Sequence, residues 1–125
     1  MRKSAFILIL AAAPVSAVIA QNMPLPQFLT KAAALEKKGA MALFSSDMGL
    51  LKKEIRASAG ALRTERLAAQ RAGRTPAYCP PEKQSGLGVA EILGHFRSIP
   101  LDRRARLTTR DAFRSLLAKK YPCPA

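Results

Sequence analysis

The residues that could take part in chemistry are few and lie far apart in this sequence. It has one histidine, His95, two cysteines, Cys79 and Cys123, and eight acidic residues. A Ser-His-Asp arrangement around His95 would be expected beside a Gly-x-Ser-x-Gly or similar motif, which the sequence does not contain. A metal site would need several His, Cys or carboxylate ligands at recognisable spacing, and no such group occurs. We therefore expect no catalytic residue, no metal and no cofactor, and we predict that the protein is not an enzyme.

The acidic residues have basic neighbours in the sequence. Glu54 is preceded by Lys53 and followed closely by Arg56, and Asp102 precedes Arg103. We expect ordinary ion pairs at both places, rather than a pair of carboxylates placed for acid–base catalysis.

The first twenty residues have the pattern of a cleaved signal peptide. A basic start precedes an unbroken apolar run over residues 5–13. The run is too short for a membrane-spanning helix, which needs roughly 20 apolar residues. We therefore predict that residues 1–20 are removed by cleavage between Ala20 and Gln21, and that the protein is periplasmic or secreted. A retained membrane anchor is the alternative.

Residues 21–125 form a chain long enough for one domain with a modest core. Outside the cytoplasm the only two cysteines are expected to pair, so we predict one disulfide between Cys79 and Cys123. Free thiols are the alternative. In the chain-entropy model, closing the loop between them adds roughly 4 kcal/mol to the free energy of unfolding. That is a large share of the total for a whole domain, which is about 5–15 kcal/mol.

Apolar residues recur every three or four positions in four segments, which is the spacing of amphipathic helices. We predict four main helices at about residues 26–38, 47–72, 89–98 and from Thr108 to Pro122. A short helical turn is expected over residues 40–44 and a compact basic turn over 101–106. Because valine and isoleucine never alternate with polar residues over a useful length, we predict an all-α fold with one disulfide.

The chain carries a large excess of positive charge. Without the two basic residues of the predicted signal peptide, 19 Lys and Arg face 8 Asp and Glu, a net charge of +11. Such a field favours acidic partners. Export argues against nucleic acid as the partner, and the few aromatic residues argue against base-stacking surfaces. An acidic protein, anionic lipid and lipopolysaccharide remain as candidate partners. The alternative is that the positive charge only keeps the domain in solution.

The densest basic feature is a group of five arginines near the C-terminus. They are Arg97, Arg103, Arg104, Arg106 and Arg110. Arginine makes flat, bidentate contacts with carboxylates and is enriched at protein–protein hot spots. We therefore predict a docking patch for an acidic partner. Local pairing with Asp102 and Asp111 is the alternative.

The C-terminal part of the chain, residues 78–124, resembles a known family. The features that carry the resemblance are Cys79-x-Pro81, an amphipathic helix to Phe96, an x-Pro step at Pro100, basic Arg103 and Arg104, and the ending Tyr121-Pro122-Cys123-Pro124. This region is similar to the end of the Tai-type (Rap/Tai) immunity proteins, which protect bacteria from type VI secretion amidase effectors. Unlike members of that family, residues 21–77 contain no cysteine pair.

The resemblance implies a small, exported, all-helical, disulfide-bonded protein. Members of the family bind a peptidoglycan amidase in the periplasm and block its active site, often as dimers. Our leading hypothesis is therefore a non-enzymatic immunity protein that occludes an amidase, with a homodimer as a further expectation. The alternative is a basic envelope protein that binds anionic lipid or lipopolysaccharide surfaces. A third hypothesis is that the helix at 47–72 mediates self-association.

Overall fold

A computed structural model describes residues 22–83 and 86–125 of the chain. The predicted signal peptide and its cleavage site between Ala20 and Gln21 lie outside the described residues. The elements are α1 (Leu25–Lys38), the 3-10 helix η2 (Gly39–Phe44), α2 (Ser46–Arg71), α3 (Val89–Ser98), α4 (Leu101–Arg104) and α5 (Thr109–Lys120). The prediction of an all-α fold with four main helices and one disulfide is confirmed for this part of the chain.

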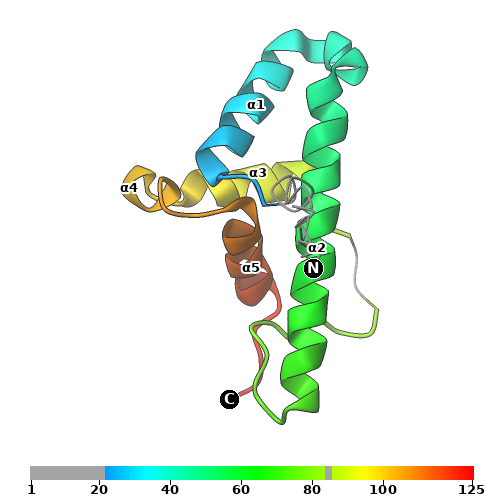
Figure 1. The fold of residues 1–125 in the computed structure, drawn as a ribbon, viewed down its shortest axis with the longest axis vertical. Coiled ribbons are helices and arrows are strands. Elements are labelled where there is room, and N and C mark those ends of the chain that lie inside the picture. Colours follow the sequence, from blue (N-terminus) through cyan, green and yellow to red (C-terminus); the bar gives the residue numbers. More distant parts are fainter. Residues whose placement is uncertain (1–21, 84–85) are drawn as a thin grey trace, which may run out of the picture.

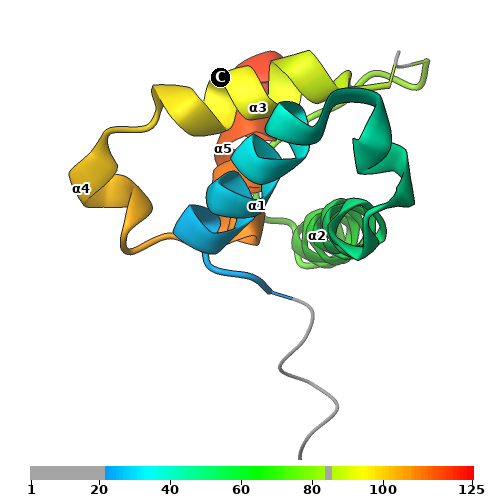
Figure 2. The same ribbon diagram turned by 90° about the horizontal axis from the view of Figure 1, so that it is seen from above.

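The helices surround one core beside the long helix α2. α1 and α2 are joined by η2 at one end of the molecule, and α3 crosses behind α1 (Figure 1). α5 lies beside the middle of α2, and the C-terminal tail continues along its far half. Viewed from above, α4 projects on the side opposite to α2 (Figure 2).

α1 begins and ends where its sequence predicts. Pro26 lies in the first turn, where a helix has no use for the N–H that proline lacks. Gly39 follows the last turn with a φ of 54°, a left-handed conformation that glycine adopts readily. The buried residues recur at helical spacing and are Leu25, Phe28, Ala32 and Leu35.

α2 is the spine of the molecule. The Ser45 hydroxyl caps its first turn by accepting the backbone N–H of Asp47 at 3.3 Å. Its 26 residues give a length of about 39 Å. The buried positions follow one stripe along the helix and are Leu51, Glu54, Ser58, Leu62 and Ala69. Two of these five residues, Glu54 and Ser58, have polar side chains within a helical face that otherwise meets the core.

α5 begins with a capping box formed by Thr108 and by Asp111 three residues later. The Thr108 hydroxyl accepts the backbone N–H of Asp111 at 3.2 Å, and the Asp111 carboxylate accepts the backbone N–H of Thr108 at 3.0 Å. The Arg114 guanidinium then joins α5 to α2, because it donates to Asp111 at 2.9 Å and to Glu65 at 3.0 Å.

The apolar core joins all four main helices. Phe96 of α3 is fully buried and packs edge-on against Phe28 of α1, with ring centroids 5.5 Å apart. Phe113 and Leu117 of α5 and Leu62 of α2 belong to the same buried cluster. α1 and α5 each pack against the other three main helices, and α2 and α3 are joined through them, so none forms an independent unit.

The disulfide ties the segment after α2 to the tail after α5. Cys79 and Cys123 are bonded, 44 residues apart in sequence. The backbone N–H of Cys79 also donates to the carbonyl of Tyr121 at 2.8 Å, so the two segments are held together by a hydrogen bond beside the covalent link. This pairing confirms the predicted disulfide.

The extended residues before α1 are clamped between α2 and α5. The buried backbone N–H of Met23 donates to the Glu54 carboxylate at 2.6 Å. The Met23 carbonyl accepts from the backbone N–H of Thr109 at 2.8 Å and from its hydroxyl at 2.9 Å. Glu54 is only 2% exposed and forms no ion pair with Lys53 or Arg56, so the predicted pairing was wrong. Its carboxylate faces the core, whereas both cations lie on the solvent side of α2.

Replacing both cysteines by serine should lower the free energy of unfolding by about 4 kcal/mol, because the unfolded chain is no longer closed into a loop. Urea denaturation followed by circular dichroism measures this loss. Reductant should destabilise the natural protein by a similar amount and leave the double variant unchanged. Equal stability of the variant and the oxidised protein would contradict the proposed role of the bond.

The Glu54→Ala substitution should destabilise the fold by about 2 kcal/mol, because it leaves the buried Met23 N–H without an acceptor. Glu54→Gln should cost less, since its side-chain carbonyl can still accept that hydrogen bond. Thermal unfolding of both variants, with the exposed Glu82→Ala as control, checks this. Equal losses for the alanine and glutamine variants would argue against the hydrogen bond as the source of stability.

Candidate protein-binding surface

The five arginines of the predicted docking patch have different environments. Two of them, Arg97 and Arg104, bind other parts of the same chain. Arg104 Nε donates to the carbonyl of Ile99 at 2.6 Å, and a second nitrogen of the same guanidinium donates to the carbonyl of Arg97. These carbonyls lie at the C-terminal end of α3, where helices lack acceptor partners. Arg97 itself forms an ion pair with Glu36 of α1 at 2.8 Å. Both arginines therefore hold α3 in place.

Two other arginines of the patch point to solvent. Arg103 and Arg106 are exposed, and neither forms an ion pair among the described residues. Leu101 lies on the same turn with 76% of its surface exposed. We call Leu101, Arg103 and Arg106 the arginine corner. Figures 1 and 2 show that α4, which carries the first two of them, projects from the body of the molecule.

The sequence around Pro100 builds this projecting turn. Pro100 ends α3 because it cannot continue a helix, and its carbonyl accepts the backbone N–H groups of Arg103 and Arg104, each at 3.0 Å. The hydrogen bonds from the Arg104 guanidinium to the carbonyls of Ile99 and Arg97 hold the turn against the end of α3. Arg103 and Leu101 are thus presented on a short, braced helix rather than on an unsupported loop.

The remaining charged residues near the corner do not neutralise it. Arg110 is half-buried, and its Nε atom has no hydrogen-bond partner. Asp111 pairs with Arg114 and not with the patch. Asp102 is exposed and forms no ion pair among the described residues. The expected pairing of Asp102 with Arg103 is therefore wrong, and the corner keeps a net positive charge.

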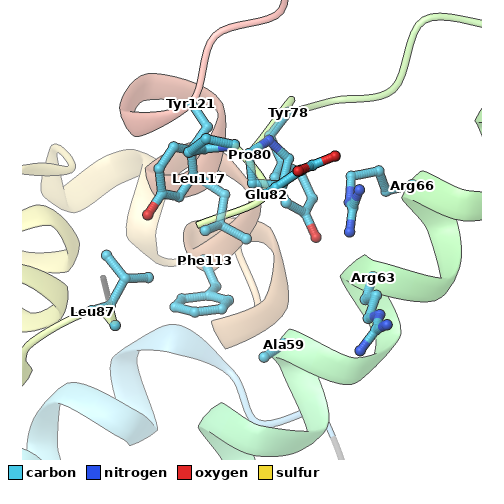
Figure 3. Close-up of a pocket in the computed structure, with 12 residues that line it drawn as sticks. Ala59, Arg63, Arg66, Tyr78, Pro80, Glu82, Leu87, Phe113, Leu117 and Tyr121 are labelled. Carbon is cyan, nitrogen blue, oxygen red and sulfur yellow. The ribbon is translucent and has the colours of Figure 1, made fainter. Parts of the chain in front are cut away.

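A separate, open cleft of about 640 Å³ lies between α2, α5 and the two segments that the disulfide links. Arg63 and Arg66 of α2 line one side, with Tyr78 next to Arg66, and Leu87 and Tyr121 lie opposite (Figure 3). The Arg66 guanidinium lies 5.4 Å from the centre of the Tyr78 ring, at the distance of a cation–π contact. This cleft could not be predicted from the sequence, because α2, the segment after it and the end of α5 come together only in the folded chain.

His95 contacts a serine, but the geometry is not that of an activated nucleophile. His95 Nε2 lies 2.7 Å from Ser115 Oγ, and the Ser115 hydroxyl donates to the carbonyl of Ala112 at 2.8 Å. Since a hydroxyl has a single proton, Nε2–H is the donor to Ser115. A general base would have to accept that proton instead. The pair therefore links α3 to α5, and this arrangement offers no nucleophile.

The described residues offer few sites for other chemistry. Within residues 22–83 and 86–125, no three His, Cys, Asp or Glu side chains gather where they could bind a metal ion. In the same part of the chain, none of the helices combines the length and the apolar character needed to span a membrane. The disulfide is compatible with an oxidising compartment outside the cytoplasm.

Comparison with known proteins adds no relative. No family model matches the chain, and neither a curated protein nor a solved structure matches it.

The pKa of His95 should lie below the ordinary value of about 6.5, because burial disfavours the charged imidazolium and Lys119 repels it. A lowered pKa means that the unfolded chain binds the proton more readily. Neutral His95 therefore contributes to the free energy of unfolding. This contribution is complete above about pH 6.5 and is lost as the pH falls toward the folded-state pKa.

An NMR titration of the single imidazole measures this pKa directly. Lys119→Gln should raise the pKa of His95 by removing the nearby positive charge, while Lys83→Gln in the remote loop should leave it unchanged. A pKa at or above the value of a free histidine would show that the ring is not partly buried beside Lys119.

Proposed function

We propose that this is an exported, periplasmic binding protein of the immunity class, without enzymatic activity, that occludes the active-site cleft of a peptidoglycan amidase. The observation that carries the proposal is the braced arginine corner on the module closed by Cys79 and Cys123. The module spans the residues that resemble the Tai-type immunity proteins, and the corner is its most prominent unpaired cationic feature.

The chemistry of the corner favours an acidic protein surface. Guanidinium groups bind carboxylates through two parallel hydrogen bonds, and arginine is less strongly hydrated than lysine. Arg103 and Arg106 have no carboxylate partner within the described part of this chain, so their donors are available to another protein. Leu101, which is 76% exposed, adds an apolar contact that would lose water in such a complex.

The mechanism is steric exclusion. A short projecting helix can enter a cleft that a flat surface cannot, and bracing by Arg104 lowers the conformational entropy lost when the turn becomes fixed in a complex. Positive charge around the corner also speeds the approach of an acidic partner. No bond in the amidase or its substrate is made or broken by this protein.

The proposal predicts that an amidase is encoded beside this gene, and binding to that amidase tests it. The exported protein should co-purify with that amidase and inhibit its hydrolysis of peptidoglycan. Arg103→Glu combined with Arg106→Glu should weaken binding by about 100-fold, because repulsion replaces two carboxylate contacts. The affinity is measured by calorimetry at physiological salt.

A matched control separates contact from overall charge. Lys52→Glu combined with Lys53→Glu changes the net charge by the same amount on a different helix and should leave amidase binding unchanged. An equal loss for both pairs of substitutions would show that the corner is not the contact. Absence of binding and of inhibition with the natural sequence would refute the proposed function.

A further inference from the structure

The connection between α1 and α2 exposes three large apolar side chains at one end of the molecule. Met41 is 65% exposed, Leu43 72% and Phe44 83%, whereas Ala42 between them is buried. With three residues per turn in the 3-10 helix η2, Met41 and Phe44 lie on the same side. We call Met41, Leu43 and Phe44 the apolar tip. Figure 1 shows that η2 caps one end of the molecule's longest axis.

Lysine side chains flank this tip on both helices. Lys37 and Lys38 occupy the last turn of α1, and Lys52 and Lys53 lie within roughly 10 Å of the start of α2. All four are exposed, and none forms an ion pair among the described residues. We call these four residues the lysine collar.

Nearby acidic side chains do not cancel the charge of the collar. Asp47 is bound to Lys31 at 2.9 Å, and Glu36 is bound to Arg97 at 2.8 Å. Each of these carboxylates is therefore matched by a cation outside the collar. Lys38 donates only to the neutral Ser45 hydroxyl, at 3.3 Å, and so keeps its full charge available.

We propose that the apolar tip inserts into the interface of an anionic phospholipid bilayer while the lysine collar contacts the headgroups. An apolar group surrounded by lysines matches the two layers of such an interface, with acyl chains below and phosphates above. Lysine suits the outer layer, because its long apolar stem can lie along the bilayer while the ammonium reaches the headgroups. This inference does not depend on the proposed amidase partner.

A second copy of the chain fits the tip poorly. Even at roughly 200 Å² for each of the three side chains, the tip offers less than the 800 Å² or so per partner that a stable interface buries. A two-fold interface at the tip would also bring two lysine collars face to face, and like charges repel. A bilayer needs no such area from each contact and supplies the opposite charge.

The geometry leaves the arginine corner free on a membrane. α4 lies at the side of the molecule and not at the end that η2 caps (Figure 1). A protein held by its tip would therefore present the corner away from the bilayer. The two surfaces also differ in their cation, with arginine at the corner and lysine at the tip.

Tryptophan fluorescence tests the insertion, because the sequence contains no tryptophan. In the exported protein, Phe44→Trp should show an emission shift to shorter wavelength with vesicles of phosphatidylcholine and phosphatidylglycerol in equal parts. Phosphatidylcholine vesicles alone should produce little shift. Val89→Trp is the matched control, since Val89 is 72% exposed on α3 and lies outside the tip. An unshifted Phe44→Trp spectrum, or equal shifts for both variants, would overturn the proposal.

Vesicle co-sedimentation then separates the apolar and ionic contributions. Phe44→Ser should weaken binding to the anionic vesicles by about tenfold, and Lys52→Gln with Lys53→Gln by about 25-fold, or fivefold for each lysine. High salt should also release the protein, because screening shortens the reach of the charges. Val89→Ser should bind like the natural sequence.

Two further outcomes would also refute this assignment. Binding to lipopolysaccharide with none to phosphatidylglycerol vesicles would give the tip another ligand. A concentration-dependent dimer in gel filtration that Phe44→Ser abolishes would assign the tip to a second copy of the chain. All of these variants change exposed side chains, and circular dichroism confirms that each one folds.

Discussion

The structure depends on α5 being anchored at both of its ends. At its C-terminal end, the Cys79–Cys123 bond holds the tail against the segment that follows α2. At its N-terminal end, Thr109 binds the carbonyl of Met23, whose N–H is bound by Glu54 of α2. One helix is thus fixed to the beginning of the fold by hydrogen bonds and to the end of the spine by a covalent link. A domain of this size buries a limited core, so such anchors account for a large share of its stability.

The same anchoring separates the surfaces that face solvent. Arg97 and Arg104 are used to hold α3 and the following turn, which leaves Arg103 and Arg106 without partners on a braced projection. At the far end, burial of Ala42 fixes η2 and directs its larger neighbours outward. Part of the net positive charge is therefore gathered at two separate places, with arginine at the corner and lysine around the tip.

The sequence predicts the helices well, because local hydrogen bonds set where they begin and end. It predicts the roles of individual charged residues poorly, because those depend on contacts between residues far apart in sequence. Gly39, Ser45 and the Thr108–Asp111 pair mark helix ends through bonds within a few residues, so they can be read from sequence. The role of Glu54 depends on Met23, 31 residues earlier, and its neighbours in sequence suggested an ion pair instead. Its position three residues after Leu51 and four before Ser58 places it on the buried stripe, which is the signal that could have found it. Likewise, five clustered arginines look alike in sequence, and only the fold separates those that bind carbonyls from those that face solvent.

The central claim is that the fold is closed by an oxidised cysteine pair in a protein matured outside the cytoplasm. Intact-mass measurement of protein recovered from the periplasm, followed by peptide mapping without reductant, tests this most directly. The account predicts a chain that begins at Gln21 and a peptide containing Cys79 linked to one containing Cys123. A chain that retains residues 1–20 and carries two alkylatable thiols would contradict it.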